Sequence, residues 1–222
     1  MEALLNKLEN LTKEVRDIML LAQSSFKIVE YLYLDKAPLE LEVIKQNQFL
    51  KYSREIHWRI YVTELSKLLA NRPGDYYNLH KFIEKFKPGF EYNSVKSINL
   101  TTLTAWENQL ISVKDKIDNL LLQRDKLYSH TDKSRAGVKN ILSIKDAREL
   151  INIVQQVVYD IYNSVFGTHM SFDPIGEPLD GLKNIMAAMV QQKKDLINSF
   201  ITHSKDVGID PADVGLPSDL LK

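Results

Sequence analysis

The chain has 222 residues, and its 29 Lys and Arg residues balance 29 Asp and Glu residues, so its formal charge is zero. This length suits one ordinary domain with an appendage, or two small domains. The balance argues against a generally basic nucleic-acid-binding coat and against an acidic tail. The chain has no cysteine, which excludes disulfides, thiolate zinc sites and a cysteine nucleophile.

The sequence gives no sign of a membrane or secretory segment. No apolar run approaches about 18 residues, which is the length that a spanning helix needs. The first residues do not place a basic stretch before an apolar run, as a secretory signal would. We therefore expect a cytoplasmic protein with no membrane association.

The first part of the chain predicts two long helices. Residues 4–32 carry apolar side chains in alternating steps of four and three, which form one stripe of a helix. Residues 38–71 carry two apolar stripes, as expected for a helix buried on more than one side. Pro38 suits the first turn of this second helix, and Arg72-Pro73-Gly74 ends it.

The next part predicts a short helix and then a longer one. Residues 75–99 contain a short helix that Pro88-Gly89 ends, followed by a loop over residues 90–99. A fourth helix is expected to begin with Thr101 or Thr102 as its cap. Its apolar seam runs through Ile117 and Leu120.

The last part predicts two more helices. The fifth starts near Ser143 and closes at Gly167, and a sixth holds Leu182 to Phe200. The fold class is therefore all-α: an antiparallel helical bundle over residues 1–167. Residues 168–222 are expected to form a linker, an additional C-terminal helix and a turn-rich tail. The sixth helix could pack on the bundle or on a partner chain.

One constellation of residues suggests chemistry. The next positions of the fourth seam are 124 and 127, so Arg124 interrupts an apolar stripe, where a charge must be paired or reach solvent. His130 follows six residues later, where the helical pattern ends. An arginine can offer several donors to a phosphate as its charge builds up, and a histidine can transfer protons near neutral pH.

An arginine and a histidine together can cleave RNA without a metal. The 2′-oxygen would attack the adjacent phosphorus, leaving a cyclic phosphate and a free 5′-hydroxyl. Two chains related by a two-fold axis would bring two such pairs to one cleft. Asp125 and Asp132 would orient the arginine or the histidine.

The local charge is consistent with a phosphate chain near this motif. From residue 121 to 150, seven basic residues face four acidic ones, a balance of +3 in a neutral chain. Lys126 and Lys133 are the candidate phosphate contacts closest to the motif. A solvated loop with ordinary charges would look much the same.

The stretch from Arg124 to His130 resembles the Arg-x(4–6)-His motif of the HEPN superfamily, in which a polar residue such as Asp125 usually follows the arginine. The wider string with Lys126 and Asp132 looks most like HEPN proteins of abortive-infection systems. The segment Ile56 to Leu69 is similar to the helix that precedes the motif there. The resemblance covers about residues 1–167.

This resemblance implies a helical bundle, a homodimer and metal-independent RNA cleavage in phage defence or a toxin–antitoxin pair. It also suggests an antitoxin or defence protein as a partner. Some toxins of this superfamily carry a tyrosine two residues after the histidine, which a nucleotidyltransferase antitoxin modifies. Asp132 stands at that position here, which argues against this mode of silencing.

Simpler interpretations stay open. Arg124 could lie at the end of the bundle and pair with an acidic neighbour, and His130 could bond the last carbonyls of its helix. The chain would then be a non-catalytic helical interaction module that binds a partner protein or RNA. No His, Asp and Glu spacing matches a metal site and no glycine-rich phosphate loop occurs, so we expect no metal and no cofactor.

Overall fold

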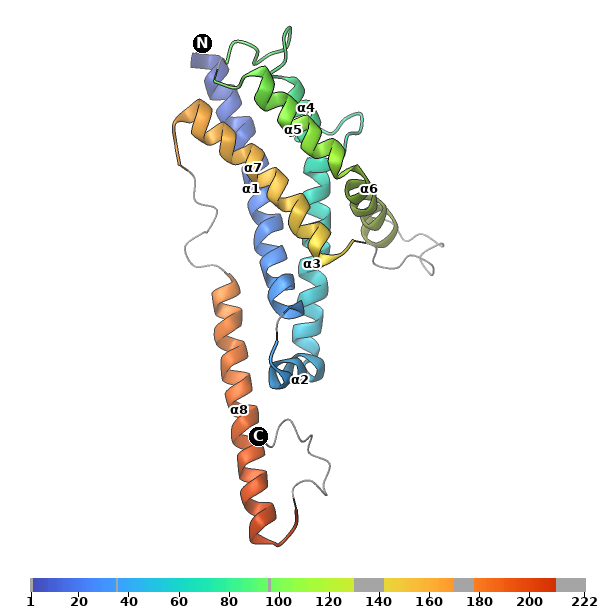
Figure 1. Ribbon diagram of the computed structural model, residues 1–222, viewed down its shortest axis with the longest axis vertical. Helices are drawn as coiled ribbons and strands as arrows, with labels where there is room; N and C mark the ends of the chain where they lie inside the picture. Colours follow the sequence, from blue (N-terminus) through green and yellow to red (C-terminus); the bar gives the residue numbers. More distant parts are fainter. Residues whose placement is uncertain (1, 35, 96, 130–141, 170–177, 211–222) are drawn as a thin grey trace. The chain divides into compact units, whose positions relative to one another are not determined.

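The computed structural model describes residues 2–34, 36–95, 97–129, 142–169 and 178–210. Within these ranges the chain consists of helices joined by turns and loops, and it contains no strand (Figure 1). The all-α class expected from the sequence is thereby confirmed.

The helices form two compact units that interleave along the chain. Unit 1 consists of Met1–Phe26 and His57–Pro174, and unit 2 consists of Lys27–Ile56 and Ile175–Lys222. The long helices α1 (Glu2–Tyr33) and α3 (Gln48–Leu69) therefore contribute to both units. The sequence suggested a domain boundary at residue 167, which divides the chain into two consecutive parts. This boundary stays a prediction.

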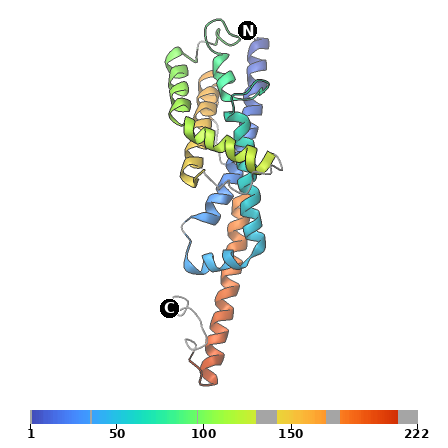
Figure 2. The same ribbon diagram turned by 90° about the vertical axis from the view of Figure 1, so that its right-hand side faces the viewer.

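Unit 1 holds most of the helices and the candidate site. Besides its parts of α1 and α3, it contains α4 (Leu79–Glu84), α5 (Leu100–Ser112), α6 (Lys114–Gln123), a π-helical turn η1 (Arg124–Ser129) and α7 (Ile144–Phe166). Figure 2 shows α6 and η1 lying across the direction of α3. This crossing brings the end of α6 to the same region as the end of α3.

The core of unit 1 is built from the apolar stripes that the sequence predicts. Burial of such stripes is the main favourable term in folding. Three helices supply many of its fully buried side chains: Leu8, Val15, Met19 and Ala22 of α1, Tyr61, Leu65 and Leu68 of α3, and Leu150, Val154, Val157 and Ile161 of α7.

Two large aromatic side chains in this core satisfy their polar atoms. The Tyr61 hydroxyl donates to the Ala147 carbonyl at 2.7 Å, and the Trp106 indole N–H donates to the Asp160 carboxylate at 2.9 Å. Both bonds end on α7, so they fix α3 and α5 against it. Such pairing avoids the cost of an unsatisfied buried donor.

Unit 2 packs α2 (Pro38–Gln46) and α8 (Pro178–Asp206) with one end of α1 and one end of α3. Its core is a separate apolar cluster: Ile28, Leu32, Val43, Ile44, Leu50, Leu182 and Met186. Lys193 on α8 donates to the Gln46 side chain at 3.0 Å beside this cluster. Within unit 2 the predicted sixth helix thus packs on residues near the start of the chain.

The single helix expected over residues 38–71 is wrong, because two helices occupy this range. Asn47 has extended backbone angles, φ −94° and ψ 112°, which interrupt the helix. Its side-chain oxygen accepts from the Leu50 backbone N–H at 3.1 Å and so caps α3. Apolar residues at helical spacing stand on both sides of this break, which is why periodicity did not reveal it.

The fourth helix also differs from the expectation. It is divided into α5 and α6 at Val113, whose angles are φ −110° and ψ 17°. Its cap is Asn99, whose side chain accepts from the Thr102 N–H at 2.9 Å, and neither Thr101 nor Thr102 serves as the cap. Asparagine is among the preferred capping residues.

The fifth helix agrees with the sequence at both ends. The Ser143 hydroxyl accepts from the Asp146 N–H at 3.1 Å, so this serine is the N-cap of α7. Gly167 closes the helix in the left-handed conformation with φ +63°, which glycine adopts without steric cost.

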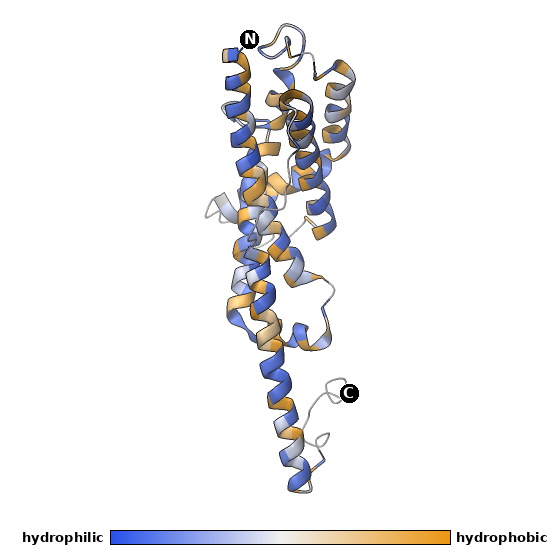
Figure 3. Ribbon diagram, turned by 90° about the vertical axis from the view of Figure 1, so that its left-hand side faces the viewer, coloured by the Kyte–Doolittle hydropathy of each residue, from blue (hydrophilic) through white to orange (hydrophobic). Residues whose placement is uncertain are grey.

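Hydrophilic and hydrophobic residues alternate along the helices, as Figure 3 shows for α8. Among the described residues, no helix is both long enough and apolar enough to cross a membrane.

Candidate functional site

The candidate site begins where α6 changes its winding. After Gln123 the chain continues as the π-helical turn η1, which starts at Arg124. π-helical turns are rare and frequently occur at functional sites. The sequence placed Arg124 on the apolar seam, but the fully buried position belongs to Gln123. Arg124 lies beside it, with a side chain that is 15% exposed.

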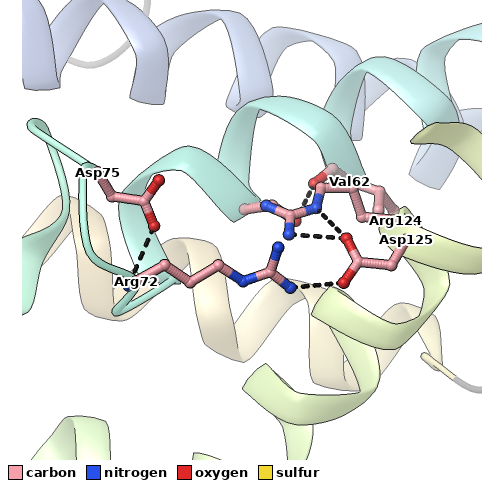
Figure 4. Close-up of polar contacts among 6 residues, drawn as sticks. Val62, Arg72, Asp75, Arg124 and Asp125 are labelled. Carbon is pink, nitrogen blue, oxygen red and sulfur yellow. Dashed lines mark hydrogen bonds and ion pairs between the residues drawn. The ribbon is translucent and has the colours of Figure 1, made fainter. Parts of the chain in front are cut away.

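Arg124, Asp125 and Arg72 form one cluster, named here the Arg72–Asp125–Arg124 cluster (Figure 4). The Arg124 guanidinium donates from Nε to one Asp125 carboxylate oxygen at 2.8 Å, and its second nitrogen lies 2.7 Å from the same oxygen. The Arg72 guanidinium bonds the other oxygen at 2.5 Å. One carboxylate therefore holds two guanidinium groups next to each other.

Arg72 is positioned by a turn that follows α3. Its backbone N–H donates to the Asp75 carboxylate at 3.1 Å, and Gly74 within this turn has φ +92°. The Lys81 ammonium donates to the Arg72 carbonyl at 3.0 Å and to the Asp75 carbonyl at 2.8 Å. These bonds fix the backbone from which the Arg72 side chain reaches Asp125.

The cluster keeps a net positive charge. Partial burial raises the pKa of the Asp125 carboxyl, but the hydrogen bonds and charges of Arg72 and Arg124 outweigh this and leave the pKa below its usual value. Asp125 is therefore an anion at neutral pH. Two guanidinium groups (+2) and one carboxylate (−1) give +1, which is the sign that a phosphate group requires.

A further arginine fixes the other end of η1. Arg59 on α3 donates to the Tyr128 carbonyl at 3.3 Å, and its guanidinium lies 5.9 Å from the centre of the Tyr128 ring. The Gln123 side-chain N–H donates to the Tyr128 hydroxyl at 3.4 Å. Arg59 and Arg72 therefore hold η1 at two points, Tyr128 and Asp125.

The structure brings together some of the residues that the sequence singled out. Arg124 and Asp125 are in direct contact. Lys126 lies in η1 and is half-buried. His130, Asp132 and Lys133 lie outside the described residues, so their roles stay predictions.

Sequence reasoning missed Arg72 and Arg59. Arg72 was interpreted only as part of the turn that ends a helix, and it contacts a residue 53 positions away along the chain. Nothing in a single sequence indicates such a pair.

The other described histidines are partly buried or isolated. His57 lies with its Nδ1 3.5 Å from the Ser25 hydroxyl, and burial lowers its pKa. Burial also lowers the pKa of His80 on α4, against smaller opposing effects of the Leu69 backbone and Glu107. In the part of the chain that the structure describes, no three His, Asp or Glu side chains gather in a metal-binding arrangement.

A comparison with protein families places the chain in a known family. The family model HEPN_AbiU2, described as AbiU2, matches residues 1–185, which include every residue of the Arg72–Asp125–Arg124 cluster. No curated protein and no solved structure matches the chain.

Proposed function

The chain belongs to the AbiU2 family of HEPN proteins, and from this we propose that it is a metal-independent endoribonuclease of a phage-defence or toxin–antitoxin system. Membership identifies an abortive-infection-type HEPN protein. The proposal of nuclease activity rests on one observation, the Arg72–Asp125–Arg124 cluster. It is a fixed positive charge at the start of the turn that precedes His130 in the sequence.

The proposed reaction is an internal transfer at phosphorus. The 2′-hydroxyl loses its proton to a base as its oxygen bonds the phosphorus, and the bond from phosphorus to the 5′-oxygen breaks. The leaving 5′-oxygen takes up a proton. The products are a 2′,3′-cyclic phosphate and a 5′-hydroxyl, so atoms and charges balance without a co-reactant.

The roles follow from the chemistry of each group. Arg124 is the donor to the phosphate oxygens, whose charge increases in the transition state. Asp125 and Arg72 hold its guanidinium in place, so little reorganisation is needed at the moment of reaction. His130 transfers the proton, and Asp132, Lys126 and Lys133 are supporting candidates from the motif.

We further expect the active unit to be a homodimer. One chain supplies one Arg124 and one His130, whereas the reaction needs a proton acceptor and a proton donor. A two-fold axis at the motif would supply both. An antitoxin or another defence protein is the partner expected to restrain the activity.

A second candidate function is a non-catalytic interaction module that binds a partner protein or RNA. The observation that favours it is the pairing of Arg124 with Asp125 within the chain, together with the low exposure of the Arg124 side chain. This is the pairing with an acidic neighbour that a purely structural arginine would show. It predicts a bound partner and no RNA cleavage.

The deciding experiment is cleavage of a mixed tRNA and mRNA pool by the purified protein in EDTA. We expect products with 5′-hydroxyl ends, and we expect Arg124→Ala and His130→Ala each to lower the rate by about 10²-fold or more. Thermal unfolding of each variant shows whether the fold is intact, because Arg72 still neutralises Asp125 when Arg124 is removed.

A matched control comes from an exposed position. His203→Ala on α8 removes a histidine that is not part of the motif and should cleave as the wild type does. Wild-type rates in both Arg124→Ala and His130→Ala would remove the nuclease hypothesis. If neither the wild type nor any variant cleaves RNA, and the chain forms a stable complex with a partner, it is an interaction module.

A further inference from the structure

A polar pocket lies between α4 and α5 in unit 1, beside the candidate site. Its volume is about 230 Å³. It is lined by Asn71, His80, Lys81, Ile83, Glu84, Lys87, Glu107 and Leu110. The Arg72–Asp125–Arg124 cluster does not include any of these residues. We call it the α4–α5 pocket.

The size and charge of the pocket favour a small neutral ring. Pockets for drug-sized ligands measure roughly 300–1,000 Å³, so this smaller pocket suits a single ring system. Two lysines and two glutamates line it, and the Lys87 ammonium lies 2.6 Å from the Glu107 carboxylate. These charges cancel, which makes the pocket a poor phosphate site. Ile83 and Leu110 are buried and supply apolar surface for a ring face.

The polar lining is rich in hydrogen-bond acceptors. Glu84 and Glu107 accept through their carboxylates, and the Asn71 amide can both accept and donate. His80 is half-buried, and burial lowers its pKa. Its hydrogen bond to the Leu69 backbone is a smaller effect that favours the protonated ring, so a His80 ring N–H is the donor in that bond. Burial keeps the ring neutral, so its second nitrogen is an acceptor. Such a lining suits a ligand that carries amino or imino N–H groups.

The pocket adjoins the cluster through two residues. Asn71 lines the pocket and directly precedes Arg72, so their Cα atoms lie about 3.8 Å apart. Lys81 also lines the pocket, and its ammonium donates to the Arg72 carbonyl at 3.0 Å. The Arg72 backbone therefore borders the pocket, and its side chain extends from there to Asp125.

We propose that the α4–α5 pocket binds one nucleobase of a single-stranded RNA whose backbone phosphate lies at the Arg72–Asp125–Arg124 cluster. This inference rests on the proposed function and specifies its substrate class. Unpaired RNA is the form that displays a free Watson–Crick edge, which proteins recognise through hydrogen bonds and ring contacts. Amino and imino groups on that edge match the acceptors of the pocket.

The test measures binding of short RNA that cannot be cleaved. Fluorescence anisotropy compares labelled 2′-O-methyl hexamers of each base with an abasic 2′-O-methyl hexamer that has the same phosphates, at one salt concentration. We expect the preferred base-containing hexamer to bind about tenfold more tightly than the abasic one. Asn71→Ala and His80→Ala should remove most of this difference and leave the abasic affinity unchanged.

Two further variants complete the test. Arg72→Ala should weaken both hexamers alike, because it acts on the phosphate. Asn152→Ala, at an exposed position of α7, is the matched control for Asn71→Ala and should change neither. Asn71 is exposed, so its variant keeps the test valid even if His80→Ala fails to fold.

The outcomes separate this inference from the proposed function. Equal affinity of the wild type for base-containing and abasic hexamers would overturn the base pocket, and so would a base preference that survives Asn71→Ala. Cleavage and phosphate binding could still stand in both cases. Failure of the wild type to bind any hexamer would instead overturn RNA as the ligand, and with it the proposed function.

Discussion

At the scale of single residues, Asp125 is the group on which the geometry of the candidate site depends. Its carboxylate is shared between Arg124, its neighbour in sequence, and Arg72, which comes from the turn after α3. Without it, two guanidinium groups would repel each other at close range. The same contact that fixes Arg124 therefore also makes the cluster sensitive to acid.

The pH dependence of stability should show this directly. The pKa of Asp125 is lower in the folded chain than its usual value. The pairing thus stabilises the fold at pH values above the pKa of Asp125 in the unfolded chain, about 4. This contribution is lost as the pH falls through the lower pKa of the folded chain. We expect Asp125→Asn to be less stable than the wild type at pH 6, with the difference shrinking toward pH 2.

Thermal unfolding between pH 2 and 6 measures this difference. Asp195→Asn, at an exposed position of α8, is a control that should keep the acid sensitivity of the wild type. A constant difference between Asp125→Asn and the wild type across this range would contradict the assigned role of the carboxylate.

The sequence identified two of the three residues of this cluster. Arg124 and Asp125 were predicted because a charge on an apolar seam is costly and because the motif resembles a known one. Arg72 was not, because its role arises from a contact between distant parts of the chain. The α4–α5 pocket was missed for the same reason, since its lining comes from three separate segments.

At the scale of elements, the ends of the helices depend on side chains that cap them. Periodicity predicted where apolar stripes run, and Ser143 and Gly167 were identified correctly as the ends of α7. Val113 was not seen as a break, because the stripe keeps its steps of three and four across it. Asn47 was not seen either, because apolar residues at helical spacing stand on both sides of it. Capping bonds, in contrast with the stripes, are local and easily removed.

Asn99 offers a test of this dependence. Its side chain accepts from the Thr102 N–H at 2.9 Å at the start of α5. We expect Asn99→Ala to lower the free energy of unfolding by about 1 kcal/mol, and Asn99→Ser to lower it much less. Urea unfolding measures both. Equal losses in the two variants would show that the capping bond does not stabilise α5.

At the scale of the whole molecule, the two units have separate apolar cores. The core of unit 2 joins α2 and α8 to the ends of α1 and α3, and Met186 on α8 is 1% exposed within it. Truncation of such a side chain leaves a cavity that lowers stability by about 2–5 kcal/mol. The segments that lose stability should show whether each unit has its own core.

We expect Met186→Ala to reduce protection from hydrogen exchange chiefly in residues 27–56 and 178–206. Amide exchange followed by mass spectrometry resolves this by segment, because proteins open in cooperative units. Met189→Ala, at a partly buried position beside the same cluster, should have a smaller effect. Equal loss of protection throughout unit 1 would contradict separate cores.

The interleaving of the units also affects how the chain is made. Residues 27–56 leave the ribosome long before α8, which completes their core. At about 5–20 residues per second, the nascent chain must wait on the order of ten seconds with apolar side chains such as Leu32 and Ile44 uncovered. Unit 2 therefore closes only after α8 has been translated, so a message that is truncated before α8 yields a chain whose second core never forms.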